Sequence, residues 1–299
     1  MVSAALNKAA VLIEALPYIR KFYGATFVIK YGGSVMRESV PRSSLMLDLV
    51  LLKHIGINPV LVHGGGPEIN ELLDKLALES TFVNGLRVTG PEVMRVVQMV
   101  LSGQVNKDIV AAINSSGGRA IGLSGLDGPI IRVEPISSEL GRVGRITEVN
   151  PRSLQMLSQE GYIPVLASLG LGPDGQSYNI NADLVAGEVA VALNAAKLIM
   201  MTDVEGISQT VDGHKRLISQ LNPRTAEALL RSGAISGGML PKLEACIRAV
   251  RGGVGRAHII DGRLDHSLLL EIFTDTGIGT MITPDTGEDE DDELVNANI

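Results

Sequence analysis

The sequence predicts an α/β protein whose open, mainly parallel central sheet is sandwiched by helices and divided into two lobes. The first observation is alternation. Apolar strand-like runs and helix-like segments follow one another from Thr26 onward, an order typical of parallel sheets covered by helices. The second is that two of these runs end in glycines, as FVIKYGG at 27–33 and PVLVHGGG at 59–66. Ligands of such sheets bind at the carboxyl ends of the strands, so the fold class also predicts where a binding site lies.

A helix is expected over the N-terminal segment 1–23, before the sheet begins. Apolar residues recur there at helical spacing. Pro17 is expected to kink or break the helix, because proline has no backbone N–H. The segment is not needed to build the first strand, and an exposed apolar face on such an appendage commonly docks on a partner subunit.

The remaining elements alternate in order along the chain. The Asn84-Gly85 pair predicts the turn of a hairpin, and proline at a first helical turn marks several helix starts. The strand-like runs are 26–33, 58–66, 82–89, 119–125, 129–136, 141–150, 161–170, 197–203, 256–262 and 279–283, and the helix-like segments are 41–55, 67–78, 91–114, 182–193, 223–231 and 240–252, with a further helix from Pro151.

A boundary near 193–197 divides the predicted sheet into its two lobes. We expect a first lobe over 24–194, a second over 195–284 and an acidic tail over 285–299. The tail holds a run of consecutive carboxylates at 288–293, so most of the formal net charge of −7 belongs to the tail. Such a run is typical of a solvated, disordered end.

The composition excludes several classes of protein. A single cysteine, Cys246, rules out an intrachain disulfide and a cysteine-rich metal site, and its helix-like surroundings predict a buried thiol. No apolar run reaches the ~18 residues of a membrane span, and no secretory signal opens the chain. Basic stripes with interleaved aromatics and spaced metal-ligand sets are also missing from the sequence. We expect a cytoplasmic protein that binds neither nucleic acid nor membrane and holds no metal of its own.

The two glycine-ended strands favour an anion. Lys30 precedes Gly32 and Gly33, whereas the lysine of a Walker A loop follows its glycines. Even so, glycines let backbone N–H groups approach an anion closely, and a lysine adds positive charge. Gly64 and Gly65 lead directly into a helix N-terminus, which favours negative charge. The alternative for each loop is a plain turn between strand and helix.

Polar residues further along the chain join these loops as candidates. The segment YNINAD at 178–183 places Asn179, Asn181 and Asp183 before a helix; capping that helix explains one polar residue but not three. Lys242 lies in the first turn of a later helix, where the dipole disfavours a cation, so a compensating anion is expected nearby. The alternative is a solvated surface lysine.

Two motifs are ambiguous by themselves. Arg87 follows the hairpin turn and is either a surface charge or a bidentate ligand for a carboxylate. Gly170, Gly172 and Gly175 form a literal GxGxxG, but no helix follows directly, so a turn is favoured over a dinucleotide site.

In this order the motifs IKYGGS, VHGGGPEIN, NGLRVT, GQVNKDIV, YNINADLVAGEVA and GGMLPK closely resemble those of the N-acetylglutamate kinases, a branch of the amino acid kinase family. The resemblance covers about 15–283. It implies the amino acid kinase fold and transfer of the γ-phosphoryl group of ATP, carried with Mg²⁺, to the γ-carboxylate of N-acetyl-L-glutamate in the second step of arginine biosynthesis. Since that carboxylate is ionised at neutral pH, the site must position anions and neutralise their charge.

The resemblance also implies roles for the candidates. The two lysines would stabilise the transferring phosphoryl group, the aspartate would hold both lysines, the glycines would donate N–H groups to the phosphates and the acceptor, and the arginine and asparagines would hold the substrate. The residues concerned are Lys30, Lys242, Asp183, Gly32, Gly33, Gly64, Gly65, Arg87, Asn179 and Asn181. The first lobe would bind the substrate and form a dimer, and the second would bind ATP.

Regulation is implied in the same way. Arginine-inhibited members of the family carry an N-terminal helix that interlaces dimers, so a homohexamer (a trimer of dimers) inhibited by L-arginine is expected. His258, Glu271 and Gly277 would contact the arginine, with Glu271 pairing with its guanidinium; the alternative for Glu271 is an exposed helix charge. A PII-type signal protein is a further partner found among photosynthetic relatives, and in a photosynthetic eukaryote the location would be the plastid stroma.

Two features depart from the family pattern. Leu126 stands where many relatives have lysine, and the stretch 134–145 is compact. Both lie outside the expected catalytic residues and bear on the details of a lid that, by the resemblance, would cover the substrate. Two alternatives to this function stay open. One is a kinase of the same fold that acts on aspartate or glutamate, and the other is a sensor or scaffold that binds arginine or a PII-type protein and has lost catalysis.

Overall fold

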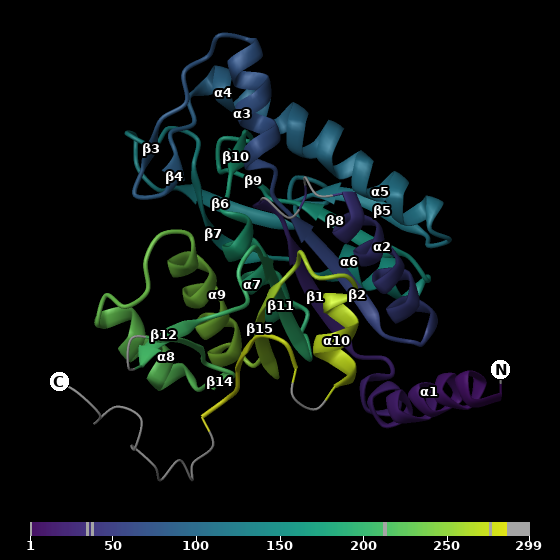
Figure 1. Cartoon of the computed structure of the whole chain (residues 1–299). Coiled ribbons are helices and arrows are strands. Elements are labelled where there is room, and N and C mark those ends of the chain that lie inside the picture. Colours follow the sequence, from purple (N-terminus) through teal and green to yellow (C-terminus); the bar gives the residue numbers. More distant parts are fainter. Residues whose placement is uncertain (1, 34–35, 37–38, 212–213, 275–276, 286–299) are drawn as a thin grey trace.

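The computed structural model describes residues 2–33, 36, 39–211, 214–274 and 277–285. At the centre of these residues lies an eight-stranded sheet (Figure 1). The six neighbouring strands β15, β11, β1, β2, β8 and β5 run parallel to one another. Strand β16 runs antiparallel to β15, and β14 runs parallel to β16. The predicted open, mainly parallel sheet is therefore confirmed. Its order is β14 (Gln220–Leu221), β16 (Thr280–Ile282), β15 (Arg256–Asp261), β11 (Lys197–Thr202), β1 (Thr26–Tyr31), β2 (Asn58–His63), β8 (Ile163–Ala167) and β5 (Ala120–Ser124).

Helices cover both faces of the sheet. Successive strand residues point to opposite faces, so Val28 joins one apolar core while Phe27 and Ile29 join the other. The first core is closed by α6 (Arg152–Gln159), α7 (Ala182–Ala192), α8 (Pro223–Arg231) and α9 (Met239–Arg251), and the second by α2 (Ser39–His54), α3 (Gly66–Lys75), α4 (Pro91–Gln98), α5 (Asn106–Ser115) and α10 (Ser267–Phe273). Burial on both sides explains why the central strands are almost continuously apolar.

Smaller sheets lie beside the central one. Strands β10 (Ser177–Asn179), β9 (Leu169–Leu171), β6 (Ile131–Pro135) and β7 (Gly144–Val149) form one, β3 (Phe82–Val83) pairs with β4 (Leu86–Arg87), and β12 (Ser208–Val211) pairs with β13 (His214–Leu217). Asn84 and Gly85 turn the β3–β4 hairpin with φ of 50° and 78°, as predicted. The GxGxxG motif spans the antiparallel β9–β10 turn, so the interpretation as a turn is confirmed. The hairpins β9–β10 and β12–β13 were not predicted, and neither were helix α10 and strand β14.

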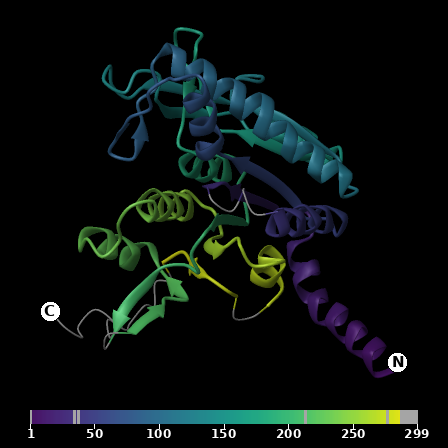
Figure 2. The ribbon, with the colours of Figure 1, turned by 45° about the horizontal axis from the view of Figure 1, so that its top comes forward.

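The N-terminal helix differs from expectation. Helix α1 (Val2–Phe22) continues through Pro17 and projects from the body of the molecule (Figures 1 and 2). The prediction of a break was wrong, because the carbonyl of Ile13 that proline leaves without a partner lies on an exposed stretch where water can reach it. Ile13 itself is 68% exposed.

The helix predicted over 91–114 is present but not uniform. Between α4 and α5 the π-helical segment η2 (Met99–Val105) interrupts the α-helical hydrogen bonding.

Cys246 is fully buried and burial raises the pKa of its thiol, in agreement with a structural role. Within the described ranges, no helix is both long and apolar enough to cross a membrane. The acidic run 288–293 lies outside the described residues.

Candidate active site

The two glycine loops lie side by side at one edge of the sheet. Strands β1 and β2 are parallel neighbours, and their register pairs Lys30 with Val62 and Tyr31 with His63. Both loops therefore begin at the same level. The N–H of Gly64 donates to the carbonyl of Tyr31 at 3.3 Å, which ties one loop to the other.

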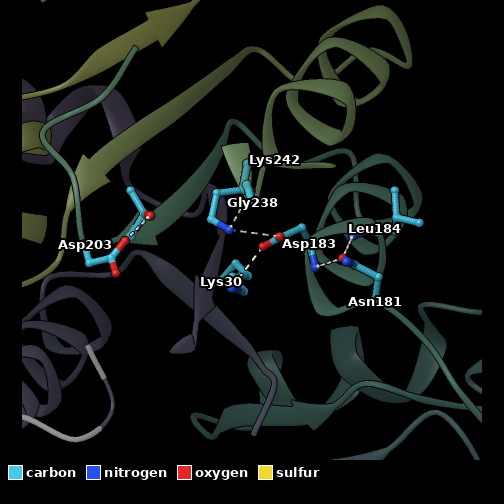
Figure 3. Close-up of polar contacts among 8 residues, drawn as sticks. Lys30, Asn181, Asp183, Leu184, Asp203, Gly238 and Lys242 are labelled. Atoms are coloured by element: carbon cyan, nitrogen blue, oxygen red, sulfur yellow. Dashed lines mark hydrogen bonds and ion pairs between the residues drawn. The ribbon is translucent and has the colours of Figure 1, made fainter. Parts of the chain in front are cut away.

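A buried cluster of charge lies beside these loops (Figure 3). The ammonium of Lys30 is 3.0 Å from Oδ1 of Asp183, and the ammonium of Lys242 is 3.2 Å from Oδ2. Lys242 also donates to the carbonyl of Gly238 at 3.1 Å. The three side chains come from β1, from the first turn of α7 and from the first turn of α9. The anion predicted near Lys242 is Asp183, so the alternative of an isolated surface lysine is wrong.

Asp183 stays ionised in this cluster. Burial by itself would raise the pKa of its carboxyl, but the ammonium groups of Lys30 and Lys242 outweigh burial and lower the pKa below its ordinary value. Each carboxylate oxygen faces one lysine, so the aspartate holds two cations at fixed positions. Two ammonium groups so close together provide a site for a further anion.

Asn181 is the N-cap of α7. Its Oδ1 accepts hydrogen bonds from the N–H of Asp183 at 2.8 Å and of Leu184 at 3.3 Å. The capping interpretation is correct for this oxygen, and capping fixes the turn that carries Asp183. Asn179 lies at the end of β10, where its amide donates to Thr89 at 3.4 Å. Capping therefore accounts for only one of the three polar residues, as expected.

A cavity of about 240 Å³ adjoins the charge cluster. Most of the predicted site residues line it: Lys30, Gly33, Gly64, Gly65, Arg87, Asn179, Asn181 and Asp183. Gly32 and Lys242 are not among the lining residues but adjoin them: a Cβ on Gly32 would be 3.2 Å from the ammonium of Lys30, and Lys242 contacts Asp183. Several lining residues were not predicted from the sequence, among them Leu101, Val143, Ser168, Phe82 and Leu86. Apolar side chains at helix or strand spacing carry no signal that separates a cavity wall from core.

Arg87 is a buried cation at the cavity wall. It is only 7% exposed, it donates to Asn70 at 2.7 Å and to Ser80, and its guanidinium lies 4.7 Å from the ring centre of Phe82. Burial lowers the pKa of Arg87. The alternative of a solvated charge on the hairpin is therefore wrong.

The residues that depart from the family pattern lie in different places. Leu126 packs against the core formed with α2 and α3 and does not line the cavity. The stretch 134–145 closes the β6–β7 hairpin, and Val143 from that stretch contacts the cavity.

A second cavity, of about 230 Å³, lies between α1 and α10. Nδ1 of His258 is 2.5 Å from Oε1 of Glu271, the N–H of Ile278 donates to Oε2 of Glu271 at 2.7 Å, and the ammonium of Lys197 is 2.9 Å from Nε2 of His258. Glu271 is 6% exposed, so it is not a surface helix charge. Gly277 also lines this cavity, and a Cβ there would lie 2.8 Å from Oε2 of Glu271.

Lys197 was not predicted to belong to this second cluster. Burial lowers the pKa of Lys197 to about 8, and the nearby Glu271 carboxylate only partly opposes that effect. The residue opens a buried strand, where the sequence gives no sign that its ammonium faces a cavity. Tyr18, Lys21 and Phe22 of α1 complete the wall.

Comparison with known proteins agrees with this fold. The amino acid kinase family matches residues 25–261. The chain belongs to the amino acid kinase family and is a kinase, which implies the use of ATP.

Within that family its similarity is to acetylglutamate kinases. The acetylglutamate kinase of Thermoanaerobacter sp. (strain X514) is 55% identical over 287 residues, which cover 95% of this chain and 96% of the relative. That of Moorella thermoacetica is 52% identical, covering 95% of this chain and 100% of the relative.

Solved structures show the same fold. An N-acetylglutamate synthase from Neisseria gonorrhoeae, complexed with coenzyme A and N-acetyl-glutamate, superimposes with a TM-score of 0.82 at 29% identity; the match covers 93% of this chain and 64% of that one. A carbamate kinase from Giardia lamblia bound to AMP-PNP shares the fold with a TM-score of 0.65 at 17% identity, covering 88% of this chain and 99% of that one.

Proposed function

We propose that this kinase transfers the γ-phosphoryl group of ATP to the side-chain carboxylate of N-acetyl-L-glutamate, as a step of arginine biosynthesis. The observation that carries the proposal is the Lys30–Asp183–Lys242 cluster beside a cavity that also holds a buried arginine. Two ammonium groups can flank a migrating phosphoryl group, while Arg87 provides a bidentate partner for a second carboxylate of the acceptor.

The arrangement needs no general base. A γ-carboxylate has a pKa of about 4.3 and is already an anion at neutral pH, so the barrier lies in bringing two anions together. Lys30 and Lys242 would neutralise the charge that develops on the phosphoryl oxygens. Asp183 would keep both ammonium groups in place, and the glycine-loop N–H groups would orient the acceptor.

The cavity wall supports an N-acylated amino acid rather than a free one. Asp183 is the only acidic residue among the described lining residues, and both of its oxygens already face lysines. A free α-ammonium would find no carboxylate partner there, whereas an acetyl group could contact Leu101, Val143 or Phe82. This argues against free glutamate or aspartate as the acceptor.

The residues fit a nucleotide that brings its own Mg²⁺. Gly33 has no atom of another described residue within 4 Å of a Cβ position, so the described part of the chain leaves room for phosphate to approach the loop. Among the described residues no group of three or more His, Cys, Asp or Glu is placed to hold a metal ion. Mg²⁺, when bound with ATP, supplies charge neutralisation between the phosphates. We assign substrate binding and dimer formation to 24–194 and ATP binding to 195–284.

We further propose that L-arginine inhibits the enzyme at the second cavity. The buried carboxylate of Glu271 would pair with the guanidinium, next to His258 and Gly277. Helix α1 supplies Tyr18, Lys21 and Phe22 to the same wall. If α1 joins dimers into a hexamer, the same helix would also contact the bound inhibitor. Addition of L-arginine should lower the rate, and an enzyme indifferent to arginine would refute this part of the proposal.

A hydroxamate assay tests the substrate. Enzyme, ATP, Mg²⁺ and hydroxylamine are incubated with N-acetyl-L-glutamate, L-glutamate or L-aspartate, and the acyl phosphate is trapped as a coloured hydroxamate. We expect product with N-acetyl-L-glutamate only. Product with glutamate or aspartate alone would overturn the assignment of the acceptor.

A further inference from the structure

His63 is buried beneath the second glycine loop and does not line the active-site cavity. It is the last residue of β2. Its Nδ1 lies 2.9 Å from the carbonyl oxygen of Gly64, and its Nε2 lies 3.0 Å from Nδ2 of Asn106. A carbonyl oxygen can only accept, so Nδ1 carries the proton and Nε2 accepts from the asparagine amide. The two contacts together assign one neutral tautomer to the ring.

Other neighbours fix the orientation of the Asn106 amide. Its Nδ2 also donates to the carbonyl of Val165 at 3.0 Å, while its Oδ1 accepts from Lys107 at 3.0 Å. Gly122 leaves room for this side chain, since a Cβ there would lie 1.8 Å from Oδ1 of Asn106. The amide can therefore present only a donor to His63.

The π-helical segment η2 brings these contacts together. Its wide turn is closed by a hydrogen bond from the N–H of Asn106 to the carbonyl of Leu101, and the extra residue in the turn rotates α5 relative to α4. Leu101 and Val105 pack directly against Gly65, where a Cβ would approach them to 2.8 Å and 3.2 Å. Segment η2 thus packs against the second glycine loop and places the side chain of Asn106 next to His63.

We propose that His63 and Asn106 are positioning residues for phosphoryl transfer, which hold the Gly64 carbonyl inward so that the N–H of Gly65 is directed toward the cavity. A peptide unit is planar and trans, so its carbonyl and its N–H point in opposite directions. Gly65 lines the cavity and His63 does not. Glycine has no side chain to prevent rotation of this unit, so the hydrogen bond from His63 has to do so. The inference rests on the proposed phosphoryl transfer.

The ring keeps its single tautomer across the working pH range. Burial lowers the pKa of His63 to about 4; the hydrogen bond to Gly64 opposes that effect and the charge of Lys107 adds to it. An imidazolium would carry protons on both nitrogens and could no longer accept from Asn106.

Two amide substitutions separate the contacts of His63. The amide nitrogen of asparagine can take the place of Nδ1, and the amide of glutamine reaches the place of Nε2. His63→Asn therefore keeps the donor to Gly64, whereas His63→Gln keeps only the contact with Asn106. We expect kcat of the glutamine variant to fall roughly 100-fold, at the lower end of what the loss of one oriented N–H donor costs, while its KM for N-acetyl-L-glutamate stays within about threefold. The asparagine variant should keep most of its turnover.

A role in packing alone predicts the opposite order. Glutamine fills the buried space of histidine more completely than asparagine does, so packing would favour the glutamine variant. Thermal unfolding of both variants provides the control. A glutamine variant as active as the asparagine variant would overturn the proposal.

The ring tautomer is measured in the wild type, without dependence on any variant's activity. Selective ¹⁵N labelling of the five histidines, assigned by the signal lost in His63→Asn, should show His63 protonated at Nδ1 at neutral pH. Asn106→Ala should let the ring exchange between tautomers and should lower kcat. A wild-type ring protonated at Nε2 would refute the proposal. A wild type without kinase activity would refute the proposed function instead, and the tautomer would still test the hydrogen-bonded pair.

Discussion

Asp183 is the residue on which the charge balance of the site depends. Its carboxylate is 5% exposed and contacts two ammonium groups, at 3.0 Å and 3.2 Å. Without it, Lys30 and Lys242 would repel each other at short range and a buried ammonium would be left unpaired, which is strongly destabilising. The same residue therefore stabilises the fold and holds the two ammonium groups of the proposed phosphate site.

Replacement of Lys242 by alanine tests the role of one ammonium. We expect Lys242→Ala to lower kcat by about two orders of magnitude or more while the protein stays folded, because the lysine side chain is partly accessible, at 15%. Lys75→Ala is the matched control, since Lys75 is 67% exposed and pairs with Glu71 on the helix surface. Steady-state kinetics and circular dichroism measure both effects. Wild-type turnover in Lys242→Ala would remove that residue from the reaction.

The pH dependence of stability tests the lowered pKa of Asp183. Because its pKa is lower in the folded state than in the unfolded state, the stabilisation by its carboxylate is fully present above the unfolded value of about 3.9 and is lost as the pH falls through the folded value. Urea unfolding of wild type and Asp183→Asn should therefore differ most near neutral pH, and the difference should shrink below about pH 4. A difference that grows on acidification would contradict this assignment.

At the scale of elements, the site depends on how strands and helix ends meet. The register of β1 against β2 brings two glycine loops to one level, and the first turns of α7 and α9 deliver Asp183 and Lys242 to the same place. A helix start is fixed by its cap. The cap of α7 thus holds the turn that carries Asp183, the aspartate of the proposed catalytic cluster.

Two caps of equal chemistry separate stability from activity. Asn181 caps α7 and Asn222 caps α8, the latter by accepting from Thr225 at 2.8 Å. Each Asn→Ala change should cost about 1 kcal/mol of unfolding free energy. Only Asn181→Ala should also lower kcat, because Asn181 lines the cavity and caps the turn that carries Asp183, whereas Asn222 is not a lining residue. Equal loss of activity in both variants would show that the effect is one of general stability.

At the scale of the whole molecule, α1 is the element that the proposed inhibition by arginine and the proposed assembly have in common. It projects from the body (Figure 2) and exposes Val11, Leu12 and Ile13, each at 64% or more. Near its other end, the ring of Tyr18 lies 6.3 Å from that of Phe273 on α10, the helix that also carries Glu271. An exposed apolar face of this kind is suited to a second copy of the chain.

A charged residue on that face tests the assembly. Leu12→Glu should reduce the proposed hexamer to dimers in sedimentation experiments, because burial of a carboxylate in an apolar contact is costly. Inhibition by L-arginine should weaken, while the rate without arginine should change little. Glu14→Gln, on the same helix, is the control. An unchanged molecular mass would show that this face is not the interface.

The site could be predicted from the sequence only in part. Lys30 and the glycines were identifiable because they stand directly after apolar strands, and Asp183 and Lys242 because each is polar at a helix start. Arg87 stayed ambiguous, since a hairpin arginine has the same local pattern whether it is buried or exposed. Leu101, Val143 and Lys197 were missed because their spacing is that of ordinary core or strand residues.

The sequence by itself determined most of the alternation of strands and helices, the mainly parallel sheet and the edge at which the proposed site lies, because hydrophobic periodicity and strand-end glycines act over a few neighbouring residues. Only the tertiary structure decided that Asp183 faces two lysines, that Arg87 is buried in the cavity wall and that α1 runs on through Pro17. These features depend on solvent exposure and on distances between segments far apart in the chain, and both are set when the helices pack on the sheet.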